Sequence, residues 1–149
     1  MLKINLEKHL NFDNKIYIAF SGGSDSSALL YLISDLRDRY EFNLEAIHIN
    51  HNLSHDSKKW EDHCKTICKN LSVPIIVRSV EIKPSGDGLE SAARKSRYSE
   101  FESILQEDDQ LLMAHHADDV AETFFLRLFR GTGSDGLGGP KIRLSLIHI

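Results

Sequence analysis

Residues 21–26 combine two glycines with three hydroxyl side chains and one carboxylate, a set of residue types that suits an anion site. Gly22 and Gly23 can adopt positive φ and let backbone N–H groups approach a ligand closely, because glycine has no Cβ. The hydroxyl groups add donors, and a helix starting here would add the positive end of its dipole. Asp25 would repel a phosphate unless a divalent cation lay between them, which favours Mg²⁺. The predicted phosphate-binding residues are Ser21, Gly22, Gly23, Ser24, Asp25 and Ser26.

Three other types of glycine-containing loop are excluded because their sequence motifs differ from residues 21–26. A Walker A loop needs a lysine after its last glycine, and none follows Gly23. A dinucleotide-binding loop needs a third glycine, and a nucleophile elbow needs a final glycine where this chain has Ser26. The remaining alternative is a serine-rich turn that binds nothing.

A second group of chemically active residues spans positions 115–122. Asp119 and Glu122 are three residues apart, so in a helix they share one face near its N-terminus. Two carboxylates there could clamp a substrate ammonium group, and burial or mutual repulsion would raise one pKa enough to make it a proton acceptor. The alternative is a solvated first turn with Asp118 as N-cap. A zinc site of these carboxylates with His115 and His116 is disfavoured, because His-x3-His spacing is absent.

Two arginines form a third candidate group. Arg94 and Arg97 are three residues apart, and guanidinium groups suit phosphate oxygens of a nucleotide or of RNA. The alternative is a solvated helix face. Further cations make the C-terminal third locally basic and predict an RNA-facing rim: Arg127, Arg130, Lys141 and Arg143.

The elements that must position these groups alternate along the chain. Short apolar runs predict strands at residues 15–20, 44–49, 75–80 and 110–114. Apolar residues at helical spacing predict helices at residues 26–40, 57–70, 89–105 and 118–130. Four strand–helix pairs in succession indicate an α/β fold, a parallel sheet between two helical layers. Ligands bind such sheets at the carboxyl ends of the strands, where the candidate residues gather.

Local patterns add expectations about two of these helices. Ser57 is the predicted N-cap of helix 57–70, whose inward face should carry Trp60, Cys64, Ile67 and Cys68. Leu89 should face inward from helix 89–105. The two cysteines are four residues apart, which is neither a redox CxxC pair nor half of a zinc knuckle, so we expect reduced thiols.

Length and composition indicate one globular domain. The chain has 149 residues, of which 41% are hydrophobic and 27% charged, and its net charge is −4. These values exclude a collagen, a coiled coil or a disordered tail, and no apolar run approaches the ~18 residues of a membrane span. The polar first 14 residues lack a signal-peptide core, so a cytoplasmic location is expected.

The motif Ser-Gly-Gly-x-Asp-Ser at residues 21–26, after a predicted buried strand, resembles the pyrophosphate loop of the ATP pyrophosphatases. These Rossmann-like, adenine nucleotide α-hydrolase-like enzymes break ATP between the α- and β-phosphates and transfer AMP to a substrate oxygen. Three further segments, residues 48–53, 90–98 and 115–131, follow in an order that resembles the N-terminal catalytic domain of the tRNA(Ile)-lysidine synthetase family.

That resemblance implies a reaction and roles for residues. The family uses ATP and Mg²⁺ to join free L-lysine to C2 of the wobble cytidine (position 34) in tRNA(Ile) with a CAU anticodon, giving lysidine, AMP and pyrophosphate. It implies Asp25 as metal ligand, and adenine contacts at the strand end that carries His48 and Asn50. It leaves the oligomeric state open and predicts no membrane partner. The implied catalytic residues are Asp25, Arg94, Arg97, His115, Asp119 and Glu122.

The resemblance also divides the chain. Residues 1–140 are expected to form the PP-loop ATP-binding catalytic domain. Residues 141–149 do not resemble the family's continuation, so the family's C-terminal tRNA-binding domains are expected to be absent. The alternating Ile142, Leu144 and Leu146 could add a strand or form an exposed edge. The alternative functions are a tRNA 2-thiolation enzyme, disfavoured by the cysteine spacing, and a nucleotide-binding module without catalysis.

Overall fold

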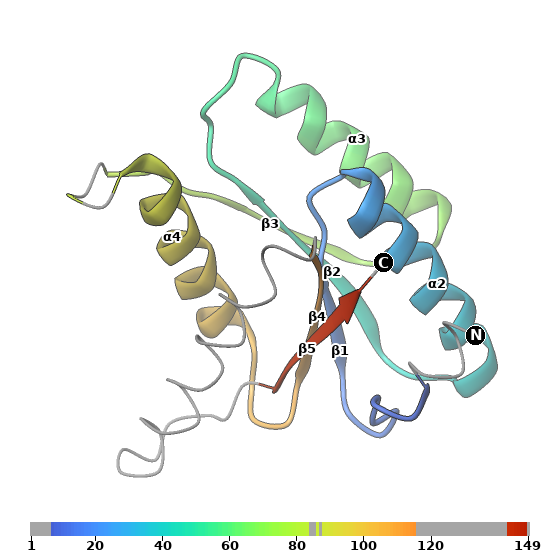
Figure 1. Cartoon of the computed structure of the whole chain (residues 1–149). Coiled ribbons are helices and arrows are strands. Elements are labelled where there is room, and N and C mark those ends of the chain that lie inside the picture. The colour runs from blue at the N-terminus through green and yellow to red at the C-terminus, as the bar shows by residue number, and fades with distance from the viewer. Residues whose placement is uncertain (1–6, 84–85, 87, 116–142, 149) are drawn as a thin grey trace, which may run out of the picture.

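The structure is a computed structural model that describes residues 7–83, 86, 88–115 and 143–148. Within them, strands and helices alternate as the sequence predicts (Figure 1). The strands are β1 (Ile16–Ala19), β2 (Leu44–Asn50), β3 (Ile75–Ser79), β4 (Gln110–His115) and β5 (Arg143–His148). The helices are α2 (Ser24–Tyr40), α3 (Ser57–Asn70) and α4 (Leu89–Ile104). The predicted helix 118–130 lies outside the described residues.

The described strands form one sheet in the order β3-β2-β1-β4-β5, and every neighbouring pair is parallel. Ile16 of β1 is in register with Leu44 of β2 on one side and with Gln110 of β4 on the other. The parallel α/β fold expected from the sequence is thereby confirmed. Residues 143–148 add a fifth strand next to β4, one of the two alternatives for this segment, and this strand stands last in the order of the described sheet.

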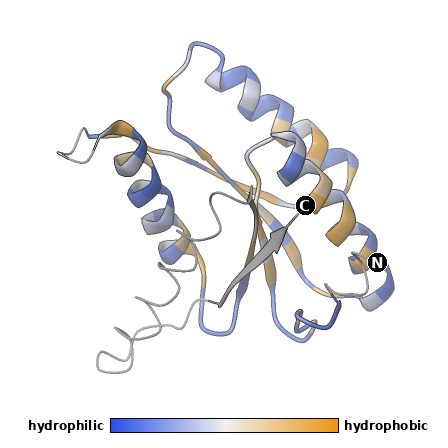
Figure 2. Ribbon diagram, viewed as in Figure 1, coloured by the Kyte–Doolittle hydropathy of each residue, from blue (hydrophilic) through white to orange (hydrophobic). Residues whose placement is uncertain are grey.

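Helices cover both faces of the sheet. α2 and α3 lie on one face and α4 lies on the other (Figures 1 and 2), and most of the apolar residues of these helices are buried against the strands. Alternate residues of β1 serve the two sides: Ile16 and Ile18 pack with Leu29 of α2, whereas Tyr17 packs with Phe101 of α4. Burial on both faces explains why these strands are continuous apolar runs.

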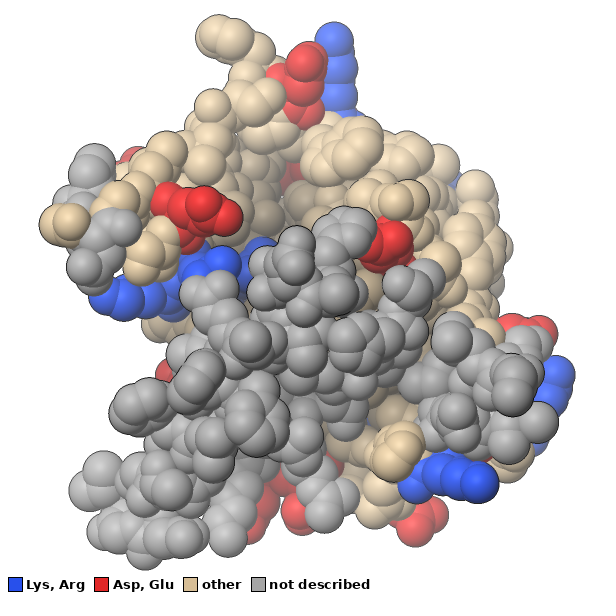
Figure 3. Space-filling model, in the orientation of Figure 1, with Lys and Arg blue, Asp and Glu red and all other residues tan. Residues whose placement is uncertain are grey.

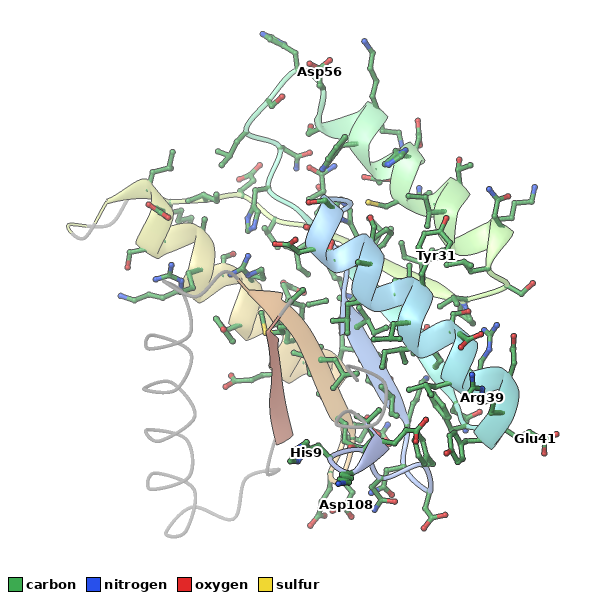
Figure 4. The ribbon with its side chains drawn as sticks, turned by 45° about the vertical axis from the view of Figure 1, so that its right-hand side comes forward. His9, Tyr31, Arg39, Glu41, Asp56 and Asp108 are labelled. Atoms are coloured by element: carbon green, nitrogen blue, oxygen red, sulfur yellow. The ribbon has the colours of Figure 1, made fainter. Side chains whose placement is uncertain are left out.

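The strand order changes direction between β1 and β4. The chain moves outward from β1 to β3 through α2 and α3, and then returns across the opposite face through α4 to β4. The strand order thus reverses between β1 and β4, and in a doubly wound sheet such a switch point forms a crevice at the carboxyl ends of the strands. Figure 4 labels Asp56 at this edge of the molecule and His9 and Asp108 at the opposite edge.

Three local expectations are wrong. Asp56, not Ser57, occupies the N-cap position of α3, and its side chain makes no capping hydrogen bond. Trp60 is 50% exposed rather than buried, because the first turn of α3 extends past the sheet to the rim of the crevice. Leu89, the first residue of α4, is also exposed. Among the described residues, no helix is long and apolar enough to cross a membrane.

Candidate active site

A cleft of about 730 Å³ lies over the carboxyl ends of β1, β2 and β4. Its floor is largely apolar and includes Ala19, Ile47 and Met113, while α3 and the loop before it form one wall and α4 forms the other. Figure 3 shows cationic side chains on the α4 side of this hollow. The cleft is thus placed where the crevice of a doubly wound sheet binds its ligands.

The phosphate loop follows β1 at one end of this cleft. Gly22 has φ +86°, a left-handed conformation that side chains rarely adopt. Gly23 does not share it: its φ is −70° and its ψ is 170°, so the expectation of positive φ holds for Gly22 alone. Ser21 Oγ accepts a hydrogen bond from Gly23 N (3.3 Å), and Ser26 Oγ accepts one from Ser21 N (3.2 Å). Both hydroxyl groups therefore hold the loop in shape.

Helix α2 starts within this loop, two residues earlier than the sequence predicts. Its first hydrogen bond runs from Ser27 N to Gly23 O (3.0 Å). An α-helix leaves the N–H groups before that bond without intrahelical partners, so those of residues 24–26 form an anion-binding end. The partly exposed carboxylate of Asp25 lies in this first turn. One carboxylate fits Mg²⁺, which usually completes its octahedron with phosphate oxygens and water.

His48 and Cys64 support the loop from behind. The buried His48 donates from Nδ1 to the carbonyl oxygen of Phe20 (2.8 Å), and Cys64 Sγ lies 3.6 Å from the same nitrogen. A Cβ added at Gly22 would lie 2.8 Å from Cys64 Sγ. The loop is therefore packed directly onto α3, and the His48 ring fixes the end of β1.

Asn50, which the resemblance assigns to adenine contacts, uses its side chain internally. Its Nδ2 donates to Glu61 Oε2 (2.9 Å), and its Oδ1 accepts from Asn52 N (2.9 Å). The buried Glu61 also accepts from Lys65 (2.8 Å) and Lys58 (3.0 Å). These hydrogen bonds, led by that from Lys65, lower the pKa of Glu61 to about 2. Glu61 thus ties the end of β2 to α3 and shapes the cleft wall.

The opposite wall carries the predicted arginines. Arg94 and Arg97 of α4 both line the cleft, and so does His51, which follows β2. Burial, followed by the positive charge of Arg97, lowers the pKa of His51, so its imidazole is neutral at pH 7. Its buried Nδ1 has no hydrogen-bond partner in the described part of the chain. Sequence reasoning missed His51 and Glu61, since only their position in the fold sets them apart.

Several predicted residues are only partly placed. His115 ends β4, so its backbone reaches the crevice, but its side chain is not among those described. Other predicted residues lie outside the described ones: His116, Asp118, the acidic clamp of Asp119 and Glu122, and Arg127, Arg130 and Lys141 of the basic rim. Arg143 begins β5. Among the described residues, no group of three or more His, Cys, Asp or Glu side chains could hold a metal ion.

Comparison of the sequence with known proteins identifies the family of the chain. The profile of the PP-loop domain matches residues 2–148, and the chain belongs to that family. It is 45% identical over 127 residues to the tRNA(Ile)-lysidine synthase of Buchnera aphidicola subsp. Acyrthosiphon pisum, covering 85% of this chain and 29% of that protein. It is 40% identical over 146 residues to the synthase of Serratia proteamaculans, covering 97% of this chain and 34% of that protein. The chain thus spans about a third of the length of these relatives.

A solved structure shares the fold. The chain matches the U34-tRNA thiolase NcsA from Methanococcus maripaludis, determined with its 4Fe-4S cluster, at a TM-score of 0.64 and 19% identity. The match covers 97% of this chain and 56% of that one. At this identity the likeness concerns the fold alone.

Proposed function

We propose that the chain binds ATP with its polyphosphate on the loop at residues 21–26 and its adenosine in the cleft. The observation that carries this proposal is the left-handed Gly22 beside the N-terminus of α2, at a cleft whose far wall carries Arg94 and Arg97. Bare N–H groups on one side and guanidinium groups on the other suit a polyanion. Asp25 would hold Mg²⁺ together with the phosphates, and the ion would offset charge on the departing pyrophosphate.

We further propose that this ATP activates the wobble cytidine of tRNA(Ile) for attack by lysine; the relatives' name, tRNA(Ile)-lysidine synthase, supports a reaction that forms lysidine in this tRNA. A pyrimidine C2 oxygen is a poor leaving group. When that oxygen attacks the α-phosphorus, the bond to the β-phosphate oxygen breaks and pyrophosphate leaves. An amine of lysine then adds to C2, loses a proton, and displaces AMP together with the C2 oxygen.

The remaining residue roles follow the same scheme. Asp119 and Glu122 would hold the lysine ammonium groups and accept the proton of the attacking amine, with His115 beside them. Arg94 and Arg97 would bind phosphate oxygens of ATP or of the anticodon loop. Residues 1–140 would make up the catalytic domain. We expect the chain to act in the cytoplasm with free lysine and tRNA as substrates.

The cysteines favour ligation over thiolation. Cys64 and Cys68 are fully buried in α3, and neither lines the cleft. Burial raises the pKa of the Cys64 thiol to about 11 and that of Cys68 to about 12, so both stay protonated at neutral pH. Sulfur transfer needs a reactive thiolate or a metal cluster at the site.

Pyrophosphate release tests the reaction directly. The chain is incubated with Mg²⁺-ATP and tRNA bearing a CAU anticodon, with and without lysine, and pyrophosphate and lysidine are measured. We expect lysidine only with both substrates, and loss of pyrophosphate release in Asp25→Ala with the circular dichroism spectrum unchanged. Glu122→Gln should impair lysine use more than ATP binding. Pyrophosphate release with that tRNA but indifferent to lysine would contradict ligation, and ATP binding without any turnover would indicate a non-catalytic module.

A further inference from the structure

Two aromatic side chains of α3 form a flat surface at the rim of the cleft. Trp60 and His63 of α3 are stacked, with ring centroids 5.3 Å apart and an interplanar angle of 22°. Trp60 is 50% exposed, and Leu53, in the loop before α3, is 58% exposed. Both Trp60 and Leu53 line the cleft. A large apolar ring that remains accessible beside a polar cleft is a suitable platform for another ring.

The charge around this platform suits a polyanion. Helix α3 carries four lysines against two carboxylates, in a chain whose net charge is −4. Lys58 precedes Lys59 and Trp60 in sequence, and both lysines are well exposed, where Lys58 pairs with Glu61 and Asp62 and Lys59 pairs with Asp56. Across the cleft, Arg94 and Arg97 line the other wall. Aromatic platforms bordered by cations are the usual means of binding single-stranded nucleic acid, because every base has a face that can stack.

The position of the indole argues for a base of RNA rather than for adenine of ATP. The Cβ position of Gly22 lies 3.4 Å from Trp60 Nε1, so the ring borders the loop proposed to hold the phosphates. In a bound nucleotide the ribose separates adenine from the phosphates. The RNA base that attacks the α-phosphorus must instead come to this end of the cleft, and its neighbours in the strand must lie at the rim.

We propose that Trp60, with His63 and Leu53, forms a stacking surface for an unpaired nucleotide adjacent to the reacting base of an RNA substrate. This inference rests on the proposed function for the identity of the RNA. Helix α3 would thereby do two things: its inner face supports the phosphate loop through Cys64, and its exposed first turn receives the substrate strand.

Fluorescence anisotropy tests this proposal. It measures the binding of a fluorescein-labelled anticodon stem-loop with the CAU sequence. Trp60→Ala should bind the stem-loop roughly 5- to 150-fold more weakly, the factor that corresponds to about 1–3 kcal/mol per stacked base. Trp60→Phe should restore most of the affinity. Tyr31→Ala is the matched control, because Tyr31 is 53% exposed but lies on α2 and does not line the cleft (Figure 4). ATP affinity, measured by calorimetry, should be unchanged in all three variants.

A second measurement needs no variant. Trp60 is the chain's single tryptophan, so its fluorescence reports this surface alone. We expect the stem-loop to quench it and Mg²⁺-ATP to leave it nearly unchanged. Four results would overturn the proposal: wild-type affinity of Trp60→Ala for the stem-loop, an equal loss of affinity in Tyr31→Ala, unquenched fluorescence, or no binding of the stem-loop at all. Parallel losses of RNA and ATP affinity would assign the ring to adenine instead. If Trp60 behaves as expected but lysidine does not form, the proposed reaction fails and the RNA surface stands.

Discussion

Single residues differ sharply within the phosphate loop, although the sequence presents its two glycines as equivalent. Gly22 is left-handed and lies against Cys64, whereas Gly23 has an ordinary extended conformation with only Ser21 Oγ at van der Waals distance from its Cβ position (3.5 Å). The sequence predicted that the loop turns tightly, because Gly-Gly between a strand and a helix has few other uses. It could not predict which glycine turns, since φ depends on the packing of α3 behind the loop.

Gly22→Ala and Gly23→Ala should therefore differ in their effects. Gly22→Ala forces a Cβ into the left-handed region and against the Cys64 sulfur, and we expect a loss of about 1–3 kcal/mol in unfolding free energy. Gly23→Ala places a Cβ in allowed space at the N-cap of α2, where alanine is less favourable than glycine, and should cost less than about 1 kcal/mol. Urea denaturation measures both. Equal destabilisation by the two substitutions would show that the strain is not specific to Gly22.

The two thiols give a second prediction at this scale. The pKa of the Cys64 thiol is raised to about 11 and that of the Cys68 thiol to about 12, mainly because both are buried. The reactive thiolate is therefore scarce in the folded chain at pH 8, and both sulfurs are covered. We expect Ellman's reagent to label neither cysteine in buffer and both in urea. Rapid labelling of the native chain would mean that α3 opens away from the loop.

At the scale of elements, alternation of apolar runs predicted seven of the described strands and helices within two residues of their observed bounds. The periodicity is strong because both faces of the sheet are buried. It failed for Trp60, which has the spacing of the inward face of α3 but lies beyond the sheet edge. Helical spacing indicates a direction around the helix axis and carries no information on where the neighbouring layer ends.

Glu61 was missed for a related reason. Lysines three residues before and four residues after it are typical of a solvated helix surface, yet the glutamate is buried and holds Asn50. Its pKa falls from the ordinary 4.5 to about 2, so its charge stabilises the fold above pH 4.5 and that contribution is lost as the pH falls towards 2. The link between β2 and α3 is therefore acid-sensitive.

Glu61→Gln should lower the unfolding free energy at pH 7 by an amount on the order of 1–3 kcal/mol. The difference from wild type should shrink between pH 5 and about pH 2, because the wild-type carboxylate then takes up its proton. Urea denaturation across this pH range measures both effects. Asp62→Asn is the control, since Asp62 is exposed and should contribute less than about 1 kcal/mol. A constant difference at all pH values would contradict the role of the charge.

At the scale of the whole molecule, the cleft joins both helical layers, with α3 on one side and α4 on the other. A ligand that bridges them stabilises the native chain in proportion to its affinity. At about 100 times its dissociation constant, Mg²⁺-ATP should add about 2.7 kcal/mol and raise the melting temperature by roughly 5–11 °C. AMP at the same concentration should give a smaller shift, because it lacks the phosphates that the loop is proposed to hold. Equal shifts in a thermal melt would contradict a polyphosphate site at residues 21–26.

The register of β1 has a consequence for the order of assembly during synthesis. Leu44, its neighbour on one side, follows soon after it in the chain, but Gln110, its neighbour on the other, is made much later. Gln110 then exchanges two hydrogen bonds with the backbone of Asn11, which fastens the start of β4 to the segment before β1. A ribosome-bound fragment ending before α4 can build β1, β2 and β3 with α2 and α3, but it leaves one edge of its central strand bare. Such a nascent chain has the phosphate loop and lacks the far wall, so nucleotide capture must wait until α4 has emerged.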